Sequence, residues 1–151
     1  MISQQNPVKL FVSHVWDTDD DYHRVFEFLE SARNFYYLNY SAPDRRPAGD
    51  KEAQKEELRR QMAPVEAVIL LASQYRRAPD LLEFQANYAK AADKPVILVQ
   101  SFGGTAAISR SLQSLADETI DWSERALVDA IRRQARHEET QRWDTIEFKI
   151  D

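Results

Sequence analysis

The stretch VEAVILLASQYRRAPDLLEFQANYAKAADKPVILVQ, residues 65–100, decides the fold of this chain. It opens with a short, β-branched and apolar run at Val65–Ala72, and it closes with a second such run at Pro95–Gln100. Runs of this kind are typical of strands that are buried on both faces. Between them, Asp80–Ala92 has the apolar spacing of a helix. A strand, a helix and a strand in this order predict two parallel strands joined by a helical crossover.

The same alternation extends to both sides of this unit. Three further runs are expected to form strands: Val8–Ser13, Phe35–Tyr40 and Thr119–Trp122. Helices are expected after the acidic segment Asp17–Asp21, over Lys51–Met62, within Ser101–Ala116, and from a capping Ser123 to Arg136. This order predicts a flavodoxin-like three-layer α/β sandwich around a five-stranded parallel sheet. We expect a single domain over residues 1–151, with its core at about 8–136 and a C-terminal extension at 137–151.

The composition excludes several classes of protein. The 151 residues include three glycines and no cysteine, which excludes a G-x-G-x-x-G fingerprint, a P-loop, a disulfide and a thiolate nucleophile. The net charge of −5 argues against a nucleic acid as a partner. No apolar run approaches the roughly 20 residues that a membrane span needs. With its polar N-terminus and no cysteine, the chain is expected in the cytoplasm and without a membrane partner.

In folds of this kind, ligands bind at the carboxyl ends of the strands. Four loop segments follow the predicted strands at this edge: Ser13–Asp20, Ser41–Asp50, Ser73–Pro79 and Ser101–Thr105. The first of them begins SHVWD, which offers hydroxyl, imidazole, indole and carboxylate groups to a sugar or a nucleotide. Alternatively, Ser13 caps a turn and Trp16 packs as a plug of the loop. A metal site is not expected, because the other two histidines are distant in the sequence from His14.

One polar residue lies on the apolar side of the predicted helix Asp80–Ala92. At about 100° per residue, Gln85 lies roughly 40° from Leu81, whereas Glu83 lies roughly 200° away on the solvent side. The expected apolar stripe consists of Leu81, Phe84, Tyr88 and Ala92. A buried amide needs hydrogen-bond partners. Gln85 therefore either bonds to the neighbouring backbone or faces a pocket.

The C-terminal stretch Trp143–Ile150 alternates with a period of two residues. Ile146, Phe148 and Ile150 are separated by polar residues, as in a strand with one buried face. Three roles are open for this stretch: an added edge strand, a contact between two copies of the chain, or local packing against the core.

Four segments together resemble a known family. They are LFVSHVWDTDDDY at Leu10–Tyr22, FYYLNYSAP at Phe35–Pro43, VILLASQY at Val68–Tyr75 and LLEFQANYAKAADKPVILV at Leu81–Val99. In this combination and order they look like the TIR-like domains of bacterial antiphage defence, and most strongly like the TIR-like signalling subunit of Thoeris systems. The resemblance extends over Val8 to Arg136 and implies the same flavodoxin-like fold.

The resemblance implies an enzyme that cleaves the bond between nicotinamide and ribose in its substrate NAD, without a metal. It also implies an ADP-ribose-derived signal for a separate effector protein, and a homo-oligomer in the active state. The position of the family's catalytic glutamate falls on Gln85, directly after Phe84. The loop Pro43–Asp50 matches the mobile loop beside the site. The resemblance also implies a nucleotide pocket lined by Ser13, His14, Trp16, Tyr40 and Ser41.

Gln85 departs from the family pattern. A glutamine keeps hydrogen bonds to ribose hydroxyls but supplies no negative charge to an oxocarbenium-like transition state, and losing one such contact costs about 10²–10³ in rate. The chain is therefore expected to bind NAD-like ligands and to turn them over poorly. It is either a natural, binding-only relative or a form in which a Glu→Gln substitution was introduced at this position.

Two other functions stay open at this point. The chain is a candidate for a non-catalytic TIR-like module that oligomerises through Pro43–Asp50 and exposed helices. It is also a candidate for a nucleoside deoxyribosyltransferase-like enzyme, a class that shares the fold and uses a glutamate nucleophile.

Overall fold

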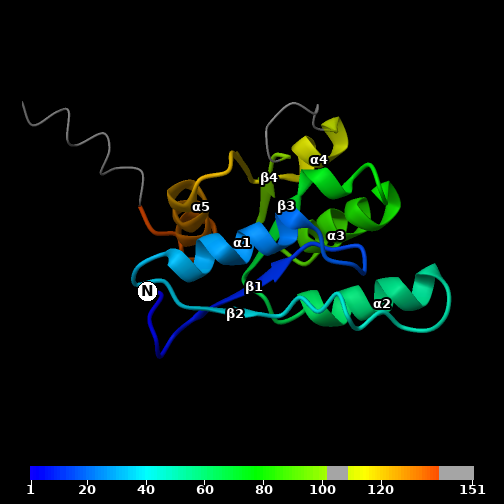
Figure 1. The fold of residues 1–151 in the computed structure, drawn as a ribbon, viewed down its shortest axis with the longest axis horizontal. Helices are drawn as coiled ribbons and strands as arrows, with labels where there is room; N and C mark the ends of the chain where they lie inside the picture. The colour runs from blue at the N-terminus through cyan, green and yellow to red at the C-terminus, as the bar shows by residue number, and fades with distance from the viewer. Residues whose placement is uncertain (102–108, 140–151) are drawn as a thin grey trace, which may run out of the picture.

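Five parallel strands form the centre of the molecule, in the spatial order β2-β1-β3-β4-β5 (Figure 1). The computed structural model describes residues 1–101 and 109–139. The strands are β1 (Val8–Val12), β2 (Tyr37–Asn39), β3 (Ala67–Leu71), β4 (Val96–Val99) and β5 (Glu118–Ile120). The helices are α1 (Asp20–Ser31), α2 (Lys51–Met62), α3 (Pro79–Ala91), α4 (Arg110–Leu115) and α5 (Glu124–Arg136), with a 3₁₀ turn at Ala72–Gln74. This order confirms the predicted flavodoxin-like α/β fold.

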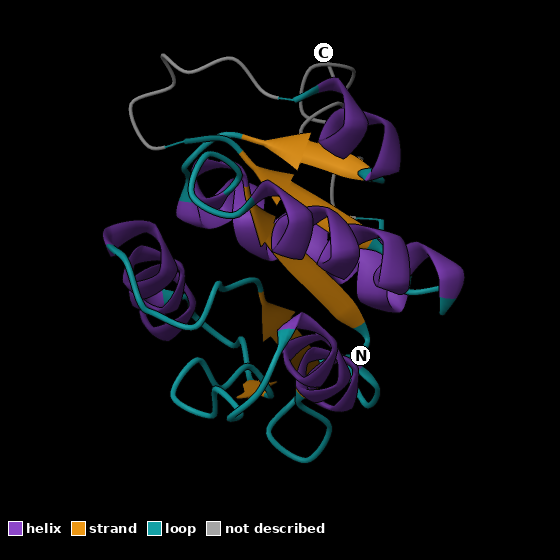
Figure 2. Cartoon of the chain, turned by 90° about the vertical axis from the view of Figure 1, so that its right-hand side faces the viewer, coloured by secondary structure: helices purple, strands orange, loops and turns teal. Residues whose placement is uncertain are grey.

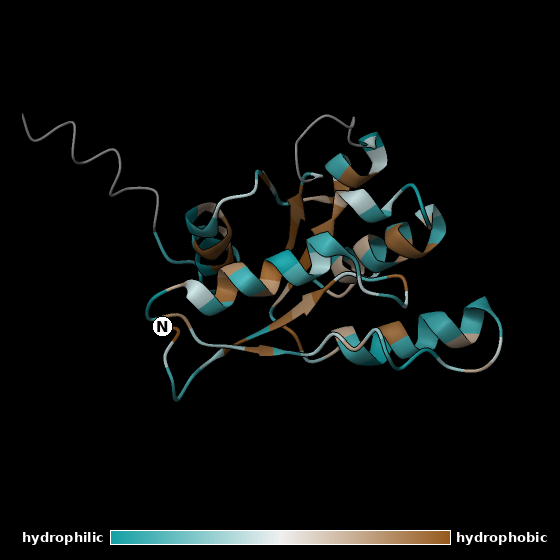
Figure 3. Ribbon diagram, in the orientation of Figure 1, coloured by the Kyte–Doolittle hydropathy of each residue, from teal (hydrophilic) through white to brown (hydrophobic). Residues whose placement is uncertain are grey.

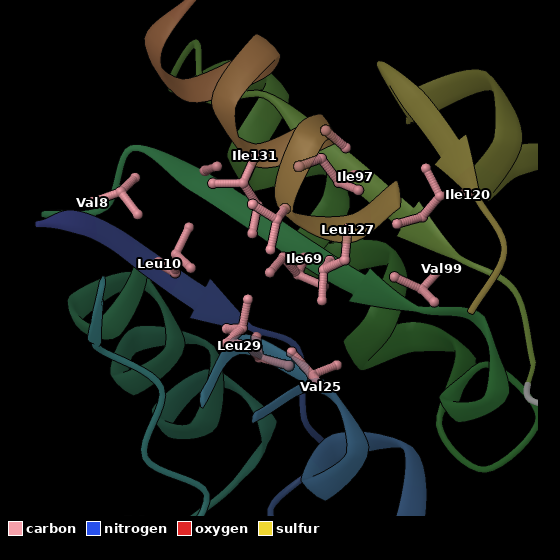
Figure 4. Close-up of a cluster of buried hydrophobic side chains, with 14 of the residues drawn as sticks. Val8, Leu10, Val25, Leu29, Ile69, Ile97, Val99, Ile120, Leu127 and Ile131 are labelled. Atoms are coloured by element: carbon pink, nitrogen blue, oxygen red, sulfur yellow. The ribbon is translucent and has the colours of Figure 1, made fainter. Parts of the chain in front are cut away.

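The helices cover both faces of the sheet, as Figure 2 shows. Successive residues of β3 alternate between two apolar clusters: Ala67, Ile69 and Leu71 pack under α1 and α5, and Val68 and Leu70 pack under α2, α3 and α4. The first cluster is drawn in Figure 4, where Val25 and Leu29 of α1 meet Leu127 and Ile131 of α5 above the strands. In Figure 3 the strands are accordingly brown, whereas much of α2 is teal.

Most strands are shorter than the apolar runs that predict them. The run Phe35–Tyr40 yields only Tyr37–Asn39, because this edge strand pairs with β1 alone, from Val8 opposite Tyr37 to Leu10 opposite Asn39. Phe35 instead turns into the core. The last strand begins one residue before the predicted Thr119 and ends at Ile120. The stretch Trp143–Ile150 lies outside the described residues.

Side-chain caps fix where three of the helices begin. The carboxylates of Asp19 and Asp50 accept hydrogen bonds from the backbone at the start of α1 and α2, and the hydroxyl of Ser123 does the same for α5. The predicted cap at Ser123 and the predicted end of this helix at Arg136 are confirmed.

The buried side of α3 differs in part from the predicted stripe. Gln85 faces inward as predicted, and none of its surface is exposed. Ala92 is exposed, however, and Phe84 and Tyr88 are only half-buried. These two rings stack at the margin of the helix with centroids 6.4 Å apart. The small residues Ala86 and Ala89 take the central positions against the sheet instead.

The burial of the central strand predicts how a substitution in it changes the free energy of unfolding. Leu70 is fully buried in β3, so Leu70→Ala is expected to lower the free energy of unfolding by about 2–5 kcal/mol. Thr119→Ala, at an exposed position of β5, is expected to change it by less than about 0.5 kcal/mol. Urea unfolding of both variants measures the difference, and a small effect at Leu70 would contradict the assigned core.

Candidate functional site

The backbone after β1 enters the interior of the molecule at Ser13. The Ser13 hydroxyl accepts a hydrogen bond from the Leu71 amide at 2.9 Å and donates one to Gln74 Oε1 at 2.7 Å. Gln74 Nε2 in turn donates to the Ser13 carbonyl at 2.9 Å. Ser13 and Gln74 are both fully buried. The predicted site residue Ser13 thus ties the end of β1 to the turn that follows β3.

His14 is buried in a single tautomer. The Trp16 amide donates to His14 Nδ1 at 3.3 Å, so the ring proton is on Nε2, which lies 2.9 Å from Gln61 Oε1 and donates to it. Burial lowers the pKa of His14 below its ordinary value of 6.5, and the hydrogen bond to Gln61 opposes this shift. Because a proton on Nδ1 would meet the Trp16 amide, this arrangement also favours the neutral ring.

Trp16 holds a backbone conformation that is unusual for a bulky residue, with φ of 75°. Its indole Nε1 donates to Gln54 Oε1 at 3.1 Å, and its ring meets the His14 ring edge-on with centroids 4.9 Å apart. Only 8% of Trp16 is exposed. The alternative in which Trp16 plugs the loop agrees with this burial, and the anchored indole holds the strained backbone in place.

Gln85 bonds in both directions to the backbone of His14. Gln85 Oε1 accepts from the His14 amide at 3.3 Å, and Nε2 donates to the His14 carbonyl at 2.8 Å and to the Leu81 carbonyl at 3.1 Å. This is the first of the two arrangements that the sequence left open. A carboxylate at this position would keep the bond from the His14 amide, but it would set an oxygen against two carbonyl oxygens.

The four buried glutamines of the described residues therefore all bind the same loop. We call Gln54, Gln61, Gln74 and Gln85 the glutamine cage; each bonds to Ser13, His14 or Trp16. The sequence reasoning missed three of its members. Gln54 and Gln61 are seven residues apart, which is two helical turns, and they flank the buried Leu58. Within a polar helix, this spacing around a leucine indicates that both glutamines lie on the buried face.

The predicted segment Ser41–Asp50 contacts the cage through Gln61 of α2. Gln61 Oε1 accepts from the Ala42 amide at 2.9 Å, and Nε2 donates to the Ala42 carbonyl at 3.2 Å. Ser41 turns toward α1 instead, where its hydroxyl lies 2.9 Å from the Tyr22 hydroxyl. Tyr40 is half-buried and packs on the cluster under α2. The structure thus brings Ser13, His14, Trp16 and Gln85 together, with Tyr40 and Ser41 beside them.

A cavity of about 350 Å³ opens at the same edge of the sheet. Its lining consists of Asp19, Asp20, Asp21, Ser73, Arg77 and Ser101. Arg77 bridges the loops after β1 and β3, because it binds Asp17 at 2.9 Å and Asp19 at 2.6 Å. The Ser73 hydroxyl is buried and has no hydrogen-bond partner. The lining therefore consists of three aspartates, two serines and one arginine, and none of the six residues predicted to form the site lines it.

Residues 1–101 and 109–139 contain neither a metal-binding cluster nor a membrane-spanning helix. No group of three or more histidine, aspartate or glutamate side chains is arranged to hold a metal ion. No helix in these ranges is both long and apolar enough to span a membrane.

The sequence matches a known protein family. The family model described as Thoeris protein ThsB, TIR-like domain, matches residues 11–105. No curated protein matches the chain. The matched residues run from β1 through β4, so they contain the whole glutamine cage.

The lowered pKa of His14 predicts how stability depends on pH. Below about pH 6.5 the unfolded chain binds a proton at this histidine more readily than the folded chain does, so the free energy of unfolding falls as the pH drops. His14→Asn removes this contribution, whereas His23→Asn, at an exposed position, keeps it. Urea unfolding at about pH 7.5 and about pH 5.5 compares the three proteins. An equal loss in His14→Asn and the parent chain would contradict the assignment.

Proposed function

Because the chain belongs to the family of Thoeris ThsB TIR-like domains, we propose that it binds NAD or an ADP-ribose-derived nucleotide at the carboxyl edge of its sheet and turns it over poorly. The family makes it a TIR-like module related to antiphage defence. In this proposal the protein binds the nucleotide in the cytoplasm, and any signal made from the nucleotide acts on a separate effector protein. The active form is a homo-oligomer.

One observation carries the proposal of poor turnover: the Gln85 amide is committed to the backbone of His14 and Leu81. A neutral amide gives no charge to stabilise the cation that develops on ribose when the bond to nicotinamide breaks. The two carboxylates of the neighbouring loop, Asp17 and Asp19, are paired with Arg77. Neither of these two carboxylates is therefore free to take over the role.

The cavity beside the cage supports binding of a nucleotide. The guanidinium of Arg77 suits a phosphate oxygen, and the carboxylates of Asp20 and Asp21 in the same lining suit ribose hydroxyls. Arg77 is partly exposed and is held in position by two carboxylates, so it is presented at the rim of the cavity. A ligand there lies beside the loop that the cage holds.

A second candidate function is a non-catalytic interaction module. It is favoured by the internal pairing of the cage: the Ser13 hydroxyl is bonded to Gln74, the His14 ring to Gln61, and the Gln85 amide to the His14 backbone. A module of this kind would associate with itself or with a partner and would have no affinity for NAD. Calorimetric titration of the chain with NAD separates the two candidates, because only the first predicts saturable heat.

The catalytic prediction is tested with Gln85→Glu. We expect this variant to release nicotinamide from NAD about 10²–10³ times faster than the parent chain, since it restores the negative charge. The carboxylate must turn away from the carbonyls of His14 and Leu81, so a loss of about 1–3 kcal/mol in unfolding free energy is expected as well. Nicotinamide is quantified by chromatography at a temperature at which both proteins are folded.

Gln61→Glu is the matched control, because it puts the same charge into the same cage from α2. It is expected to leave nicotinamide release at the level of the parent chain. Equal release by both variants would show that charge anywhere in the cage suffices. A folded Gln85→Glu that binds NAD but stays inactive, also when assembled, would refute the catalytic proposal. Mass spectrometry of its products identifies the acceptor of the ADP-ribose group.

A further inference from the structure

The strand β2 forms one edge of the sheet, and within the described chain it pairs on one side only. The Val8 amide donates to the Tyr36 carbonyl at 3.0 Å, so the backbone polar groups of the even-numbered residues of β2 point toward β1. These groups alternate in direction along a strand, so Tyr37 and Asn39 direct theirs away from β1. In Figure 1, no strand of the described chain lies on that side.

Two large hydrophobic side chains are exposed on this edge strand. Tyr36 is 39% exposed and Leu38 is 43% exposed, and Met1 is the other exposed large hydrophobic residue in the part of the chain that the structure describes. Tyr37 packs in the cluster under α1 and Tyr40 packs in the cluster under α2. Because side chains alternate along a strand, Tyr36 and Leu38 lie on the α2 side of the sheet.

The edge lacks most of the features that keep edge strands apart. Residues 34–43, NFYYLNYSAP, carry no charge, although 30% of the chain is charged. The strand contains no proline, and it pairs with β1 in continuous register without a bulge. Charged side chains, prolines and bulges are the usual protection against edge-to-edge pairing. The short length of β2 limits such pairing to Tyr37–Asn39, which the same strand of a second copy matches.

We propose that β2 pairs antiparallel with β2 of a second copy of this chain, so that two five-stranded sheets join into one. The register places Leu38 opposite the partner's Leu38 on a two-fold axis. Tyr37 then lies opposite the partner's Asn39, and Asn39 lies opposite the partner's Tyr37. Each of these two pairs exchanges two backbone hydrogen bonds, so the outward groups of β2 find donors and acceptors.

The α2 side of the joined edge is self-complementary. In this register Leu38 meets Leu38, and Tyr36 meets the partner's Tyr40, so the exposed apolar side chains of the two copies cover one another. Like charges opposite each other would oppose a two-fold contact, and the neutral strand has none. Lys9 pairs with Leu38 on β1, and its copy would lie three strand spacings away, about 14 Å, which exceeds the Debye length of roughly 8–10 Å.

The contact is independent of the proposed nucleotide. The two β2 strands run in opposite directions, so the carboxyl edges of the two sheets point away from each other. Each copy keeps its own glutamine cage, and no residue of the partner enters it. The contact also differs from association through the loop Pro43–Asp50, because it uses the backbone of β2 itself.

Single cysteines test the register, since the chain has no cysteine of its own. The Cα atoms of a non-hydrogen-bonded antiparallel pair lie about 4.5 Å apart, within the reach of a disulfide. Leu38→Cys is therefore expected to form a disulfide-linked dimer under mild oxidation, seen on a non-reducing gel. Tyr36→Cys is the matched control, because it is on the same strand, on the same side and similarly exposed.

The proposed register separates Tyr36 from the partner's Tyr36 by about four residues along the strand, or roughly 13 Å. Tyr36→Cys is therefore expected to cross-link at least about tenfold more slowly than Leu38→Cys. Equal rates would show only random encounter and would overturn the proposal. Faster cross-linking of Tyr36→Cys would overturn the register.

Sedimentation velocity over a series of concentrations tests the dimer without a cross-link. The parent chain is expected to dimerise, and Leu38→Glu is expected to weaken dimerisation at least about tenfold, because it sets two like charges opposite each other. Ala91→Glu adds the same charge at an exposed position of α3 and is expected to leave the dimer intact. Circular dichroism checks that both variants are folded. A parent chain that stays monomeric would overturn the proposal.

Hydrogen exchange identifies what covers the edge. In the parent dimer, the amides of Tyr37 and Asn39 are expected to be protected, because the partner's carbonyls accept from them. In Leu38→Glu the same amides are expected to exchange at least about tenfold faster. Protection that persists in monomeric Leu38→Glu would assign the edge to other residues of the same chain and would refute the second copy. Fast exchange in the parent chain would refute it as well.

Discussion

The two-way hydrogen bonding between the Gln85 amide and the His14 backbone is the contact on which the carboxyl edge of this sheet depends. The strand β1 lies between β2 and β3 and is covered by helices on both faces, so the chain that continues from it stays buried. Buried backbone groups that leave a sheet need new partners. Gln85 supplies them at His14, and the other members of the glutamine cage supply them at Ser13 and at the side chains of His14 and Trp16.

An amide suits this role better than a carboxylate does. It donates and accepts at once, whereas an ionised carboxylate only accepts. In the proposed function this position is that of the family's catalytic glutamate, and the amide then improves the fit of the loop at the expense of a negative charge. The neutral tautomer of His14 and the strained backbone of Trp16 belong to the same arrangement. In this chain the edge is built to hold its first loop in one conformation.

The sequence predicts the architecture well because the relevant signal is local. Each apolar run of five or so residues, such as AVILL in β3, can only be buried on both faces, and each helix between two strands implies a parallel pair. The inward direction of Gln85 also follows from helical periodicity. What the sequence leaves open is whether that amide meets a ligand or the backbone, since this depends on the path of a loop 71 residues away in the chain. For the same reason Gln74 is not apparent before the chain is folded, and the spacing of Gln54 and Gln61 indicates a shared helix face but not the loop that they bind.

We propose above all that this chain binds NAD and turns it over poorly. Proton NMR of one sample of the parent chain with excess NAD tests both parts, because it follows the side-chain amide of Gln85 and the release of nicotinamide together. The account predicts a saturable shift of the Gln85 amide signals while the NAD resonances stay intact over hours. Rapid appearance of free nicotinamide, or Gln85 signals that do not respond to NAD, would contradict it.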